Sequence, residues 1–240
     1  VGRGNGLLGR KPYPQLTRSL SYFKSFVQQS LFKLKKNNFF QSFNLTKPIN
    51  TMRIVTGRLK GRKIPFNSRQ ESSVRLTSSM LKEAVFAMLG ADLEGNSFLD
   101  LCAGSAQMGL EACSRGARAT LNEPDQRRFR HIRNLVKKWR LAGIELHNEK
   151  AQVLLPRLQA REQKYDIVYL DPPYDATFEK TPLSLALLAH LGASSILGRD
   201  GLVLSQVQKG LELPARQGQL SLQRQRTYGQ TLLGIYQATT

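Results

Sequence analysis

Short apolar runs with the length of β-strands alternate with helical patterns between residues 97 and 205. The expected strands are 97–101, 119–122, 144–147, 166–170 and 201–205. Helices are expected between them, through 110–114, around 129–139, at 153–160 and at 183–191. Strands that alternate with helices form βαβ units and a mostly parallel sheet. The sequence therefore predicts an α/β protein of the Rossmann-like class.

Further elements are expected at both ends of this alternating region. Strands at 220–227 and 230–238, joined near Tyr228-Gly229, should form a C-terminal antiparallel hairpin. Before the alternating region, 53–59 and 62–66 should form a small basic hairpin around Lys60-Gly61. A helix that Thr77 caps and Gly90 ends should follow this hairpin.

The composition is strongly basic, with 36 Lys and Arg against 17 Asp and Glu, a net charge of +19. Such a surplus indicates a polyanionic partner, most simply a nucleic acid, although charge alone does not separate RNA, DNA and an anionic membrane surface. No apolar run reaches the ~18 residues of a membrane span. Cys102 and Cys113 have no second pair, so the spacing predicts reduced thiols and no metal site.

Residues 1–51 differ in composition from the rest, with nine Lys and Arg and no Asp or Glu. A basic, Ser-rich and acid-free amphipathic stretch resembles an organellar transit peptide. The rival interpretation takes Met52 as the natural start of the protein. We expect residues 1–51 to be a disordered or weakly helical extension that takes no part in the chemistry.

The apolar run 165–170 ends in Asp171-Pro172-Pro173-Tyr174. Two prolines fix φ and remove two backbone donors, so the chain must leave the sheet in a stiff, extended bend. The bend holds a carboxylate, two carbonyl oxygens and a ring at the carboxyl end of a strand, where ligands bind in open α/β sheets. These groups suit a planar base that carries an exocyclic amine. An ordinary proline-rich loop with a solvated Asp171 is the alternative.

The first strand of the alternating region and its turn read Asp100-Leu101-Cys102-Ala103-Gly104-Ser105-Ala106-Gln107-Met108-Gly109. Small residues let the backbone approach a ligand closely before a helix begins. A strand carboxylate would repel phosphate, so it favours a cationic or zwitterionic ligand. Glu123 lies 19 residues after Gly104, near the ~20-residue spacing at which an acid binds a ribose hydroxyl. A ribose-bearing ligand with a positive centre, such as S-adenosylmethionine, fits both acids.

From Met52 to its C-terminus the chain resembles the RsmD family of bacterial 16S ribosomal RNA (guanine-N2) methyltransferases. The resemblance covers about four fifths of the chain and does not reach residues 1–51. The matching segments are 52–57 with Gly61-Arg62, 75–78 leading into 82–86, 100–117, Glu123, 171–174 and 228–231.

The resemblance implies methyl transfer from S-adenosylmethionine to the exocyclic N2 amine of a guanine, with no metal. The implied catalytic residues are Asp171, Pro172, Pro173 and Tyr174. The implied cofactor-binding residues are Asp100, Cys102, Ala103, Gly104, Ser105, Ala106, Gly109, Glu123 and Glu149. The charge pattern, rather than the resemblance, predicts the RNA-binding residues. They are Arg53, Arg58, Lys60, Arg62, Lys63 and Arg75, a basic face expected near the active-site end. A second basic run, 127–140, is equally consistent with a solvated helix face and with RNA contact.

The chain departs from the family pattern at several positions, including Leu76 and Gln206, and two departures bear on the cofactor. Ala106 stands where glycine is usual, an exchange expected to crowd the backbone against the cofactor. Lys150 stands where an Asp beside the adenine is common, which leaves Glu149 as a substitute. These departures keep open a catalytically decayed RNA-binding ribosome-assembly protein. A methyltransferase of an adenine N6 amine in DNA or another RNA also stays open, because Asp-Pro-Pro-Tyr serves exocyclic amines generally.

The sequence also suggests a division of the chain and a setting for it. Residues 52–94 should form an RNA-binding element and residues 95–240 the methyltransferase domain. The expected partner is ribosomal RNA or the assembling small ribosomal subunit, with a monomeric chain and no membrane. The expected location is the bacterial cytoplasm, or an organelle if residues 1–51 are a genuine transit peptide.

Overall fold

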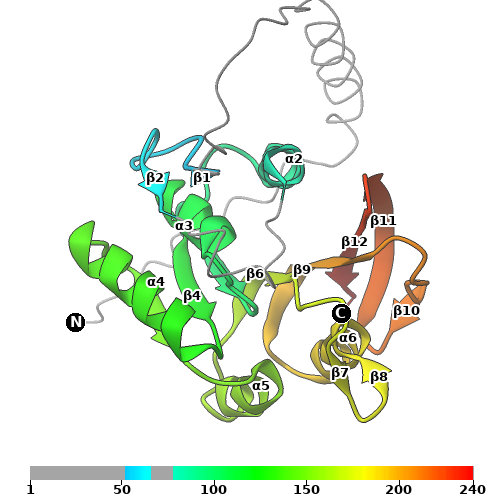
Figure 1. The fold of residues 1–240 in the computed structure, drawn as a ribbon. Coiled ribbons are helices and arrows are strands. Elements are labelled where there is room, and N and C mark those ends of the chain that lie inside the picture. The colour runs from blue at the N-terminus through cyan, green and yellow to red at the C-terminus, as the bar shows by residue number, and fades with distance from the viewer. Residues whose placement is uncertain (1–51, 66–77, 240) are drawn as a thin grey trace, which may run out of the picture. The chain divides into compact units, whose positions relative to one another are not determined.

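The computed structural model describes residues 52–65 and 78–239, which contain an eight-stranded sheet of order β10-β11-β12-β9-β6-β3-β4-β5 (Figure 1). The five strands from β9 to β5 run parallel, and the other three are antiparallel. The parallel strands are β3 (Ser97–Asp100), β4 (Arg118–Asn122), β5 (Ile144–His147), β6 (Tyr165–Leu170) and β9 (Leu197–Gln208). The antiparallel strands are β10 (Arg216–Gln217), β11 (Leu220–Tyr228) and β12 (Thr231–Ala238). The predicted Rossmann-like class and C-terminal hairpin are confirmed.

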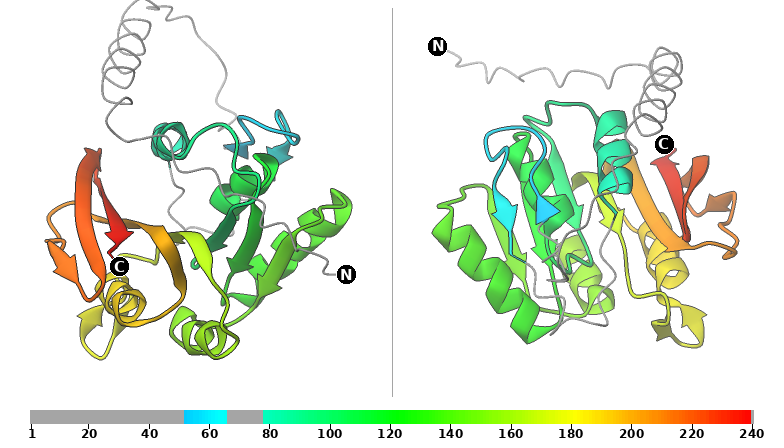
Figure 2. Two further views of the ribbon diagram at one scale, coloured as in Figure 1. Left: turned by 180° about the vertical axis from the view of Figure 1, so that it is seen from behind. Right: turned by 45° about the horizontal axis from the view of Figure 1, so that its top comes forward.

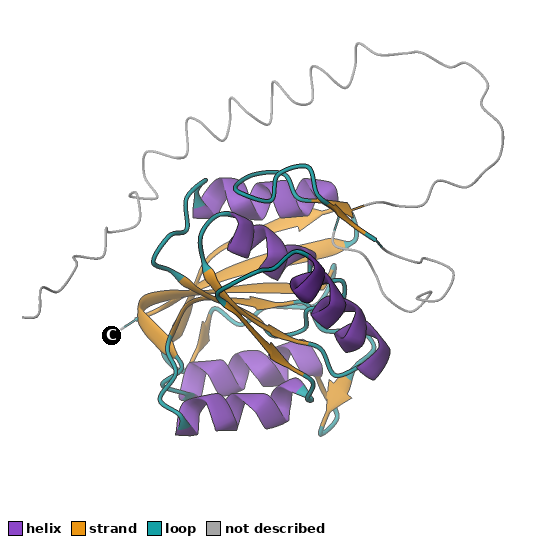
Figure 3. Cartoon of the chain, turned by 90° about the vertical axis from the view of Figure 1, so that its left-hand side faces the viewer, coloured by secondary structure: helices purple, strands orange, loops and turns teal. Residues whose placement is uncertain are grey.

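Helices cover both faces of the sheet, because side chains of each buried strand alternate between the two faces. Leu99 and Val168 pack against α5 (Ala151–Ala160) and α6 (Leu183–Ala193) on one face. Phe98 and Ile167 point to the other face, which α2 (Ser79–Leu89) and α3 (Gln107–Ser114) cover. Helix α4 (Gln126–Lys138) packs beside α3. Figure 3 shows the sheet between the two layers of helices.

The N-terminal hairpin is shorter than predicted, with β1 (Met52–Arg53) paired to β2 (Lys63–Ile64). The Ile54 amide still donates to the Arg62 carbonyl at 3.0 Å, but the ladder ends there because amides that follow bind α3. Val55 and Thr56 donate to Glu111, and Arg58 donates to the carbonyl of Ser114 at 2.8 Å. Residues 54–62 are therefore a loop that packs along a helix.

The cap of α2 also differs from the prediction. Ser78, and not Thr77, is the N-cap, and its Oγ accepts a hydrogen bond from the Leu81 amide at 3.1 Å. Thr77 lies outside the described residues. Gly90 ends the helix as expected, with φ of 101°. Among the described helices, none combines the length and apolarity needed to cross a bilayer.

Strand β9 begins four residues earlier than predicted, and the short pair of β7 and β8 was not predicted at all. The early part of β9 contains Arg199-Asp200, whose polarity interrupts the apolar pattern that marks a strand. β7 (Thr177–Phe178) and β8 (Thr181–Pro182) form a two-residue antiparallel ladder, too short for any periodicity.

The chain order reverses between β3 and β6. From β3 the chain continues to β4 and β5 on one side, and it then returns to place β6 and β9 on the other. Helices that leave two such neighbouring strands diverge, which opens a crevice at the carboxyl ends of the strands. The residues that follow β3, β4 and β6 therefore meet at one edge of the sheet.

Candidate active site

A pocket of about 940 Å³ lies at this edge. Its walls come from the turn after β3, the ends of β4 and β6, the start of α5 and the end of β9. Of the residues expected to bind cofactor or substrate, those that line it are Asp100, Cys102, Ala103, Gly104, Ser105, Glu123 and Asp171–Tyr174. The turn after β3 and the corner after β6, which lie far apart in the sequence, thus share one cavity.

Asp100 is one of two buried acids that line the pocket, with 1% of its surface exposed, and Glu123 is the other. The Asp100 carboxylate accepts a hydrogen bond from the Gly109 amide at 3.0 Å. Burial raises the pKa of Asp100 to about 7, the Gly109 amide opposes the shift, and the carboxylates of Asp171 and Glu123 add to it. A cation beside Asp100 would relieve this repulsion, so the site favours a positively charged ligand.

Cys102 lies in the same turn. Burial raises the pKa of its thiol well above the usual value, and the negative charge of Asp100 acts in the same direction. The thiol is therefore neutral at physiological pH. A neutral thiol is a poor nucleophile, so this cysteine is unsuited to covalent catalysis.

Glu123 holds the turn after β3 in place. One oxygen, Oε2, accepts the Gly104 amide at 2.8 Å. The other, Oε1, accepts the Asp125 amide at 2.8 Å and the Arg128 Nε at 3.0 Å. Because a carboxylate offers about four lone-pair positions, Oε2 retains capacity for one more donor, such as a ribose hydroxyl.

The acceptor side of the pocket is the corner after β6. Pro172 is buried, whereas Asp171 and Tyr174 are half-buried. The Tyr174 hydroxyl donates to Thr231 Oγ1 at 3.2 Å, which links the corner to the first residue of β12. Tyr169, which also lines the pocket, donates its hydroxyl to Gln206 at 2.6 Å. The Tyr174 ring is therefore fixed by β12 and the Tyr169 ring by β9.

Three residues of the predicted cofactor set lie outside the pocket lining. Ala106 is fully buried, and its methyl group packs in the cluster that joins α3, α4 and the hairpin. It adopts a left-handed conformation, φ 61°, which explains why glycine suits the position. Gly109 acts through its amide, and a Cβ there would lie 1.9 Å from Leu121. Glu149 pairs with Arg157 instead.

Arg128 and Lys150 line the pocket without having been predicted to do so. The Arg128 guanidinium pairs with Glu123 at 2.9 Å, a contact that the long run of basic residues around it obscured in the sequence. Lys150 is the exposed N-cap residue of α5. The sequence showed that Lys150 replaces the Asp common in the family. It did not show whether Lys150 or Glu149 faces the cavity.

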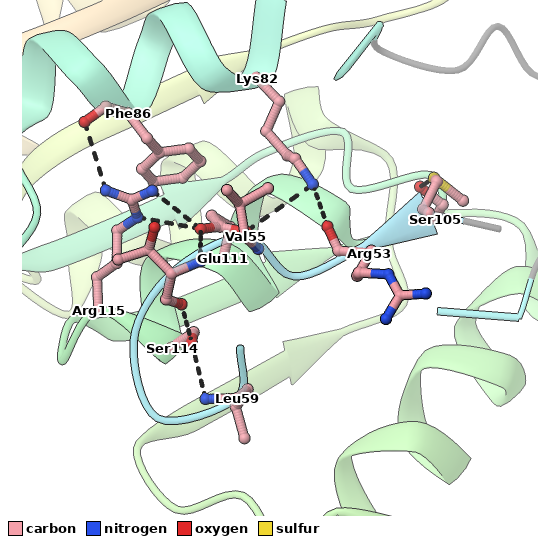
Figure 4. Close-up of polar contacts among 11 residues, drawn as sticks. Arg53, Val55, Leu59, Lys82, Phe86, Ser105, Glu111, Ser114 and Arg115 are labelled. Atoms are coloured by element: carbon pink, nitrogen blue, oxygen red, sulfur yellow. Dashed lines mark hydrogen bonds and ion pairs between the residues drawn. The ribbon is translucent and has the colours of Figure 1, made fainter. Parts of the chain in front are cut away.

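A buried network beside the pocket was also missed. Glu111, fully buried on α3, accepts the Val55 amide at 2.8 Å and the Thr56 amide at 3.0 Å (Figure 4). Arg115 donates to the same carboxylate at 3.0 Å, and Lys82 lies 3.8 Å from it. Burial lowers the pKa of Lys82, while Glu111 opposes that shift.

The Glu111 network joins three elements. Lys82 donates to the Arg53 carbonyl at 2.5 Å, and Arg115 donates to the Gly90 carbonyl at 2.9 Å. Thus α2, α3 and the hairpin meet at a single carboxylate. No sequence signal pointed to this network, because Glu111 sits in a helix where an exposed acid would be unremarkable.

The basic residues of the hairpin do not gather at the pocket. Arg58 donates to the Ala142 carbonyl at 3.4 Å, and the Arg62 guanidinium lies 5.4 Å from the Trp139 ring. Both contacts lie beyond the C-terminal end of α4, whereas the pocket is at its N-terminal end. The expectation that this face lies near the active-site end is wrong for these two residues. Arg75 lies outside the described residues.

Comparison with solved structures identifies the fold as that of a Rossmann-like methyltransferase. A hypothetical protein of Thermus thermophilus matches with a TM-score of 0.64 and 27% identity, over 77% of this chain and 98% of that one. A structure described as a complex with SAH shares the fold alone, at 16% identity and a TM-score of 0.50, over 60% of this chain and 46% of that one.

The model of the family described as Conserved hypothetical protein 95 matches residues 52–237, and the chain belongs to this family. A curated relative is the ribosomal RNA small subunit methyltransferase D of Escherichia coli strain K12. It is 28% identical over 189 residues, which are 78% of this chain and 89% of the relative. The resemblance found in the sequence is confirmed.

Proposed function

We propose that the protein transfers a methyl group from S-adenosylmethionine to the N2 amine of a guanine in small-subunit ribosomal RNA. One observation carries the proposal: Asp100 and Glu123 share a pocket with Asp171–Tyr174. This arrangement supports a cationic, ribose-bearing cofactor on one side and a planar amine on the other. The name of the Escherichia coli relative supports the RNA substrate.

The residues on the cofactor side fit S-adenosylmethionine. When bound, the cofactor would supply an electrophilic methyl group on a sulfonium. Asp100 would attract its positive charge, and the free lone pair of Glu123 Oε2 would accept a ribose hydroxyl. The backbone of Ala103 and Gly104 would pass close to the ligand, since small side chains leave it accessible.

The corner after β6 would orient the amine. The lone pair of an exocyclic amine is delocalised into the ring, so the nitrogen is a poor nucleophile. Asp171 and the Pro172 carbonyl would accept its two hydrogens and direct its lone pair toward the methyl carbon. Tyr174 would stack on the base, which must first be turned out of its helix. The transfer then depends mainly on positioning.

In this proposal the two parts of the chain have different tasks. Residues 95–240 carry the pocket, and residues 52–94 contribute RNA contacts through the hairpin. The polyanionic partner accounts for the net charge of +19.

The test is methyl transfer from labelled S-adenosylmethionine to small ribosomal subunits and to their naked RNA, both from cells that lack this activity. We expect label on one guanine, identified as N2-methylguanosine by nucleoside analysis. Asp171→Ala should lower kcat by about 100-fold or more, within the range for a group that handles the reacting proton. N6-methyladenosine as the product would overturn the guanine assignment.

A matched control shows whether the loss of kcat is specific to Asp171 or follows from removing any nearby carboxylate. Asp175 follows the corner, is exposed and also lines the pocket, so Asp175→Ala should leave kcat within a few-fold of wild type. Calorimetry with S-adenosylmethionine tests the decayed RNA-binding protein. Tight binding would exclude that alternative, and absence of binding would favour it.

A further inference from the structure

Helix α4 and the N-terminal hairpin carry one set of exposed cations. Neither residues 52–65 nor residues 126–144 contain an Asp or a Glu. The exposed cations of the two segments are Arg53, Arg58, Lys60, Arg62, Lys63, Arg127, Arg130, Arg133, Lys137, Lys138 and Arg140. We call this set the α4–hairpin face.

The two segments form a single surface because they pack directly on each other. Ile54, Leu59 and Ile64 of the hairpin share a core cluster with Ile132 and Leu135 of α4. The hairpin also contacts the segment that follows α4, because Arg62 lies over the Trp139 ring and Arg58 donates to the Ala142 carbonyl. Figure 2 shows the hairpin beside α4 on one side of the sheet.

The α4–hairpin face runs from the pocket to the hairpin turn. At its N-terminal end, α4 supplies Arg128, which lines the pocket. At the other end of the helix, Trp139 lies under Arg62. The 13 residues of α4 span about 20 Å at 1.5 Å per residue. Several successive phosphates of a nucleic-acid strand can lie along such a length.

The hairpin half of the face is held in place before any ligand binds. Its amides are bound by Glu111 and Ser114, and Lys82 holds the Arg53 carbonyl (Figure 4). A surface fixed in this way loses little conformational entropy on binding.

The chemistry of the face suits phosphates better than unstacked bases. Phe129 of α4 and Trp139, the C-cap residue of that helix, have half-buried rings. Each ring is covered by an arginine, Arg133 at 5.9 Å and Arg62 at 5.4 Å. Single-stranded RNA is bound by stacking on exposed rings, which this face does not offer among its described residues. Helical RNA is bound through its phosphates and 2′-hydroxyls.

The same geometry argues against an anionic membrane. An interfacial helix inserts its apolar side into the bilayer. In α4 that side is occupied, because Ile132 and Leu135 are 1% and 5% exposed within the core.

We propose that the α4–hairpin face binds the phosphate backbone of a helical RNA segment next to the target nucleotide, which positions that nucleotide at the pocket. The proposal rests on the proposed RNA methyltransferase function and adds to it the form of RNA and the surface that holds it.

The test compares two variants of the full chain that each lose three exposed cations. One is Arg130→Gln/Lys137→Gln/Lys138→Gln on the face. The control is Arg161→Gln/Arg199→Gln/Arg216→Gln, whose positions follow α5 or lie in β9 and β10. The probes are a 20-base-pair RNA duplex and a 20-nucleotide single strand, each measured by fluorescence anisotropy over a range of salt concentrations.

We expect the face variant to bind the duplex at least about 10-fold more weakly. Its salt slope should fall by about 1 for each lost phosphate contact. The control should stay within about two-fold of wild type. Both variants should bind S-adenosylmethionine as wild type does by calorimetry, because none of the six residues lines the pocket.

Three results would overturn the α4–hairpin assignment: equal losses in the two variants, a wild-type preference for the single strand, or full methylation of small subunits by the face variant. Failure of the proposed function would give a different pattern. The wild-type protein would bind the duplex and the face variant would bind it more weakly, but the wild-type protein would methylate no ribosomal RNA.

Discussion

Two buried carboxylates lie close together in the sequence and have opposite surroundings. Glu111 is met by two backbone amides, an arginine and a lysine. Asp100 has the Gly109 amide on one side and the carboxylates of Asp171 and Glu123 nearby. Among the contacts of the described residues, the first carboxylate has two cationic partners and the second has none. A buried acid that the fold leaves unneutralised therefore indicates a ligand site.

The largest expected effect comes from removing the satisfied carboxylate. Glu111→Gln leaves Lys82 and Arg115 without their buried counter-charge, and breaking such a pair costs about 3–5 kcal/mol. Urea unfolding followed by circular dichroism should show this loss in the free energy of unfolding. The exposed Glu162 gives the control, since Glu162→Gln should change stability by less than about 0.5 kcal/mol. A loss below about 1 kcal/mol for Glu111→Gln would contradict the comparison.

At Asp100, removal of the charge is expected to raise the free energy of unfolding rather than lower it. Its pKa is raised in the folded state, so the protonated form is favoured and the associated stability is present below about pH 4 and lost as the pH rises to about 7. Asp100→Asn keeps an oxygen for the Gly109 amide and carries no charge. The variant should be more stable than wild type at pH 8, by an amount on the order of 2 kcal/mol. Equal stabilities at pH 8 would show that burial of Asp100 costs nothing.

Two glycines of the hairpin test how closely the hairpin packs against α3, the helix that carries Glu111. Gly57 and Gly61 both have positive φ, 83° and 85°, but a Cβ at Gly57 would lie 1.8 Å from the Ser114 carbonyl, whereas Gly61 has open space. Gly61→Ala should cost about 1–2 kcal/mol for its backbone conformation alone. Gly57→Ala should cost about 1–3 kcal/mol more, because the loop must move away from α3. Equal melting temperatures for the two variants would contradict the close approach.

A smaller effect is expected on cofactor affinity. A bound cation favours ionised Asp100, so binding of S-adenosylmethionine should release protons below about pH 7 and tighten as the pH rises to that value. Calorimetry in buffers of different ionisation enthalpy measures this release. Asp100→Asn should bind about 10-fold more weakly at pH 8 and lose this part of the proton release. Unchanged release in the variant would assign it to another group.

The sequence predicted the part of the fold that repeats a local pattern. The parallel strands and the C-terminal hairpin lie largely where apolar periodicity places them. Strands β3, β4 and β6 are buried along most of their length, and β5 and β11 follow the pattern although they are mostly half-buried or exposed. The short β1–β2 ladder was overpredicted. Its amides bind Glu111 and Ser114, which lie more than 50 positions away, and no local pattern reports such a partner.

In the site, too, positions set by local pattern were predictable and positions set by distant packing were not. Side chains at the carboxyl ends of β3, β4 and β6 were predictable, since a parallel sheet brings such ends together. Ala106 and Glu149 were misplaced relative to the cavity because a loop's direction depends on what packs behind it. Arg128, Lys150 and the Thr231 contact with Tyr174 depend on tertiary packing. The division at residue 95 stays a prediction.

Helix α3 carries the Gly109 amide that holds Asp100 and, two residues later, the carboxylate that holds the hairpin. Less than one helical turn separates these two attachments, and a turn is among the stiffest spacers that a protein has. The placement of the hairpin relative to Asp100 is therefore set by helix geometry. Sequence changes elsewhere in the fold can alter how tightly either end binds its partner, but they leave the offset between the two ends unchanged.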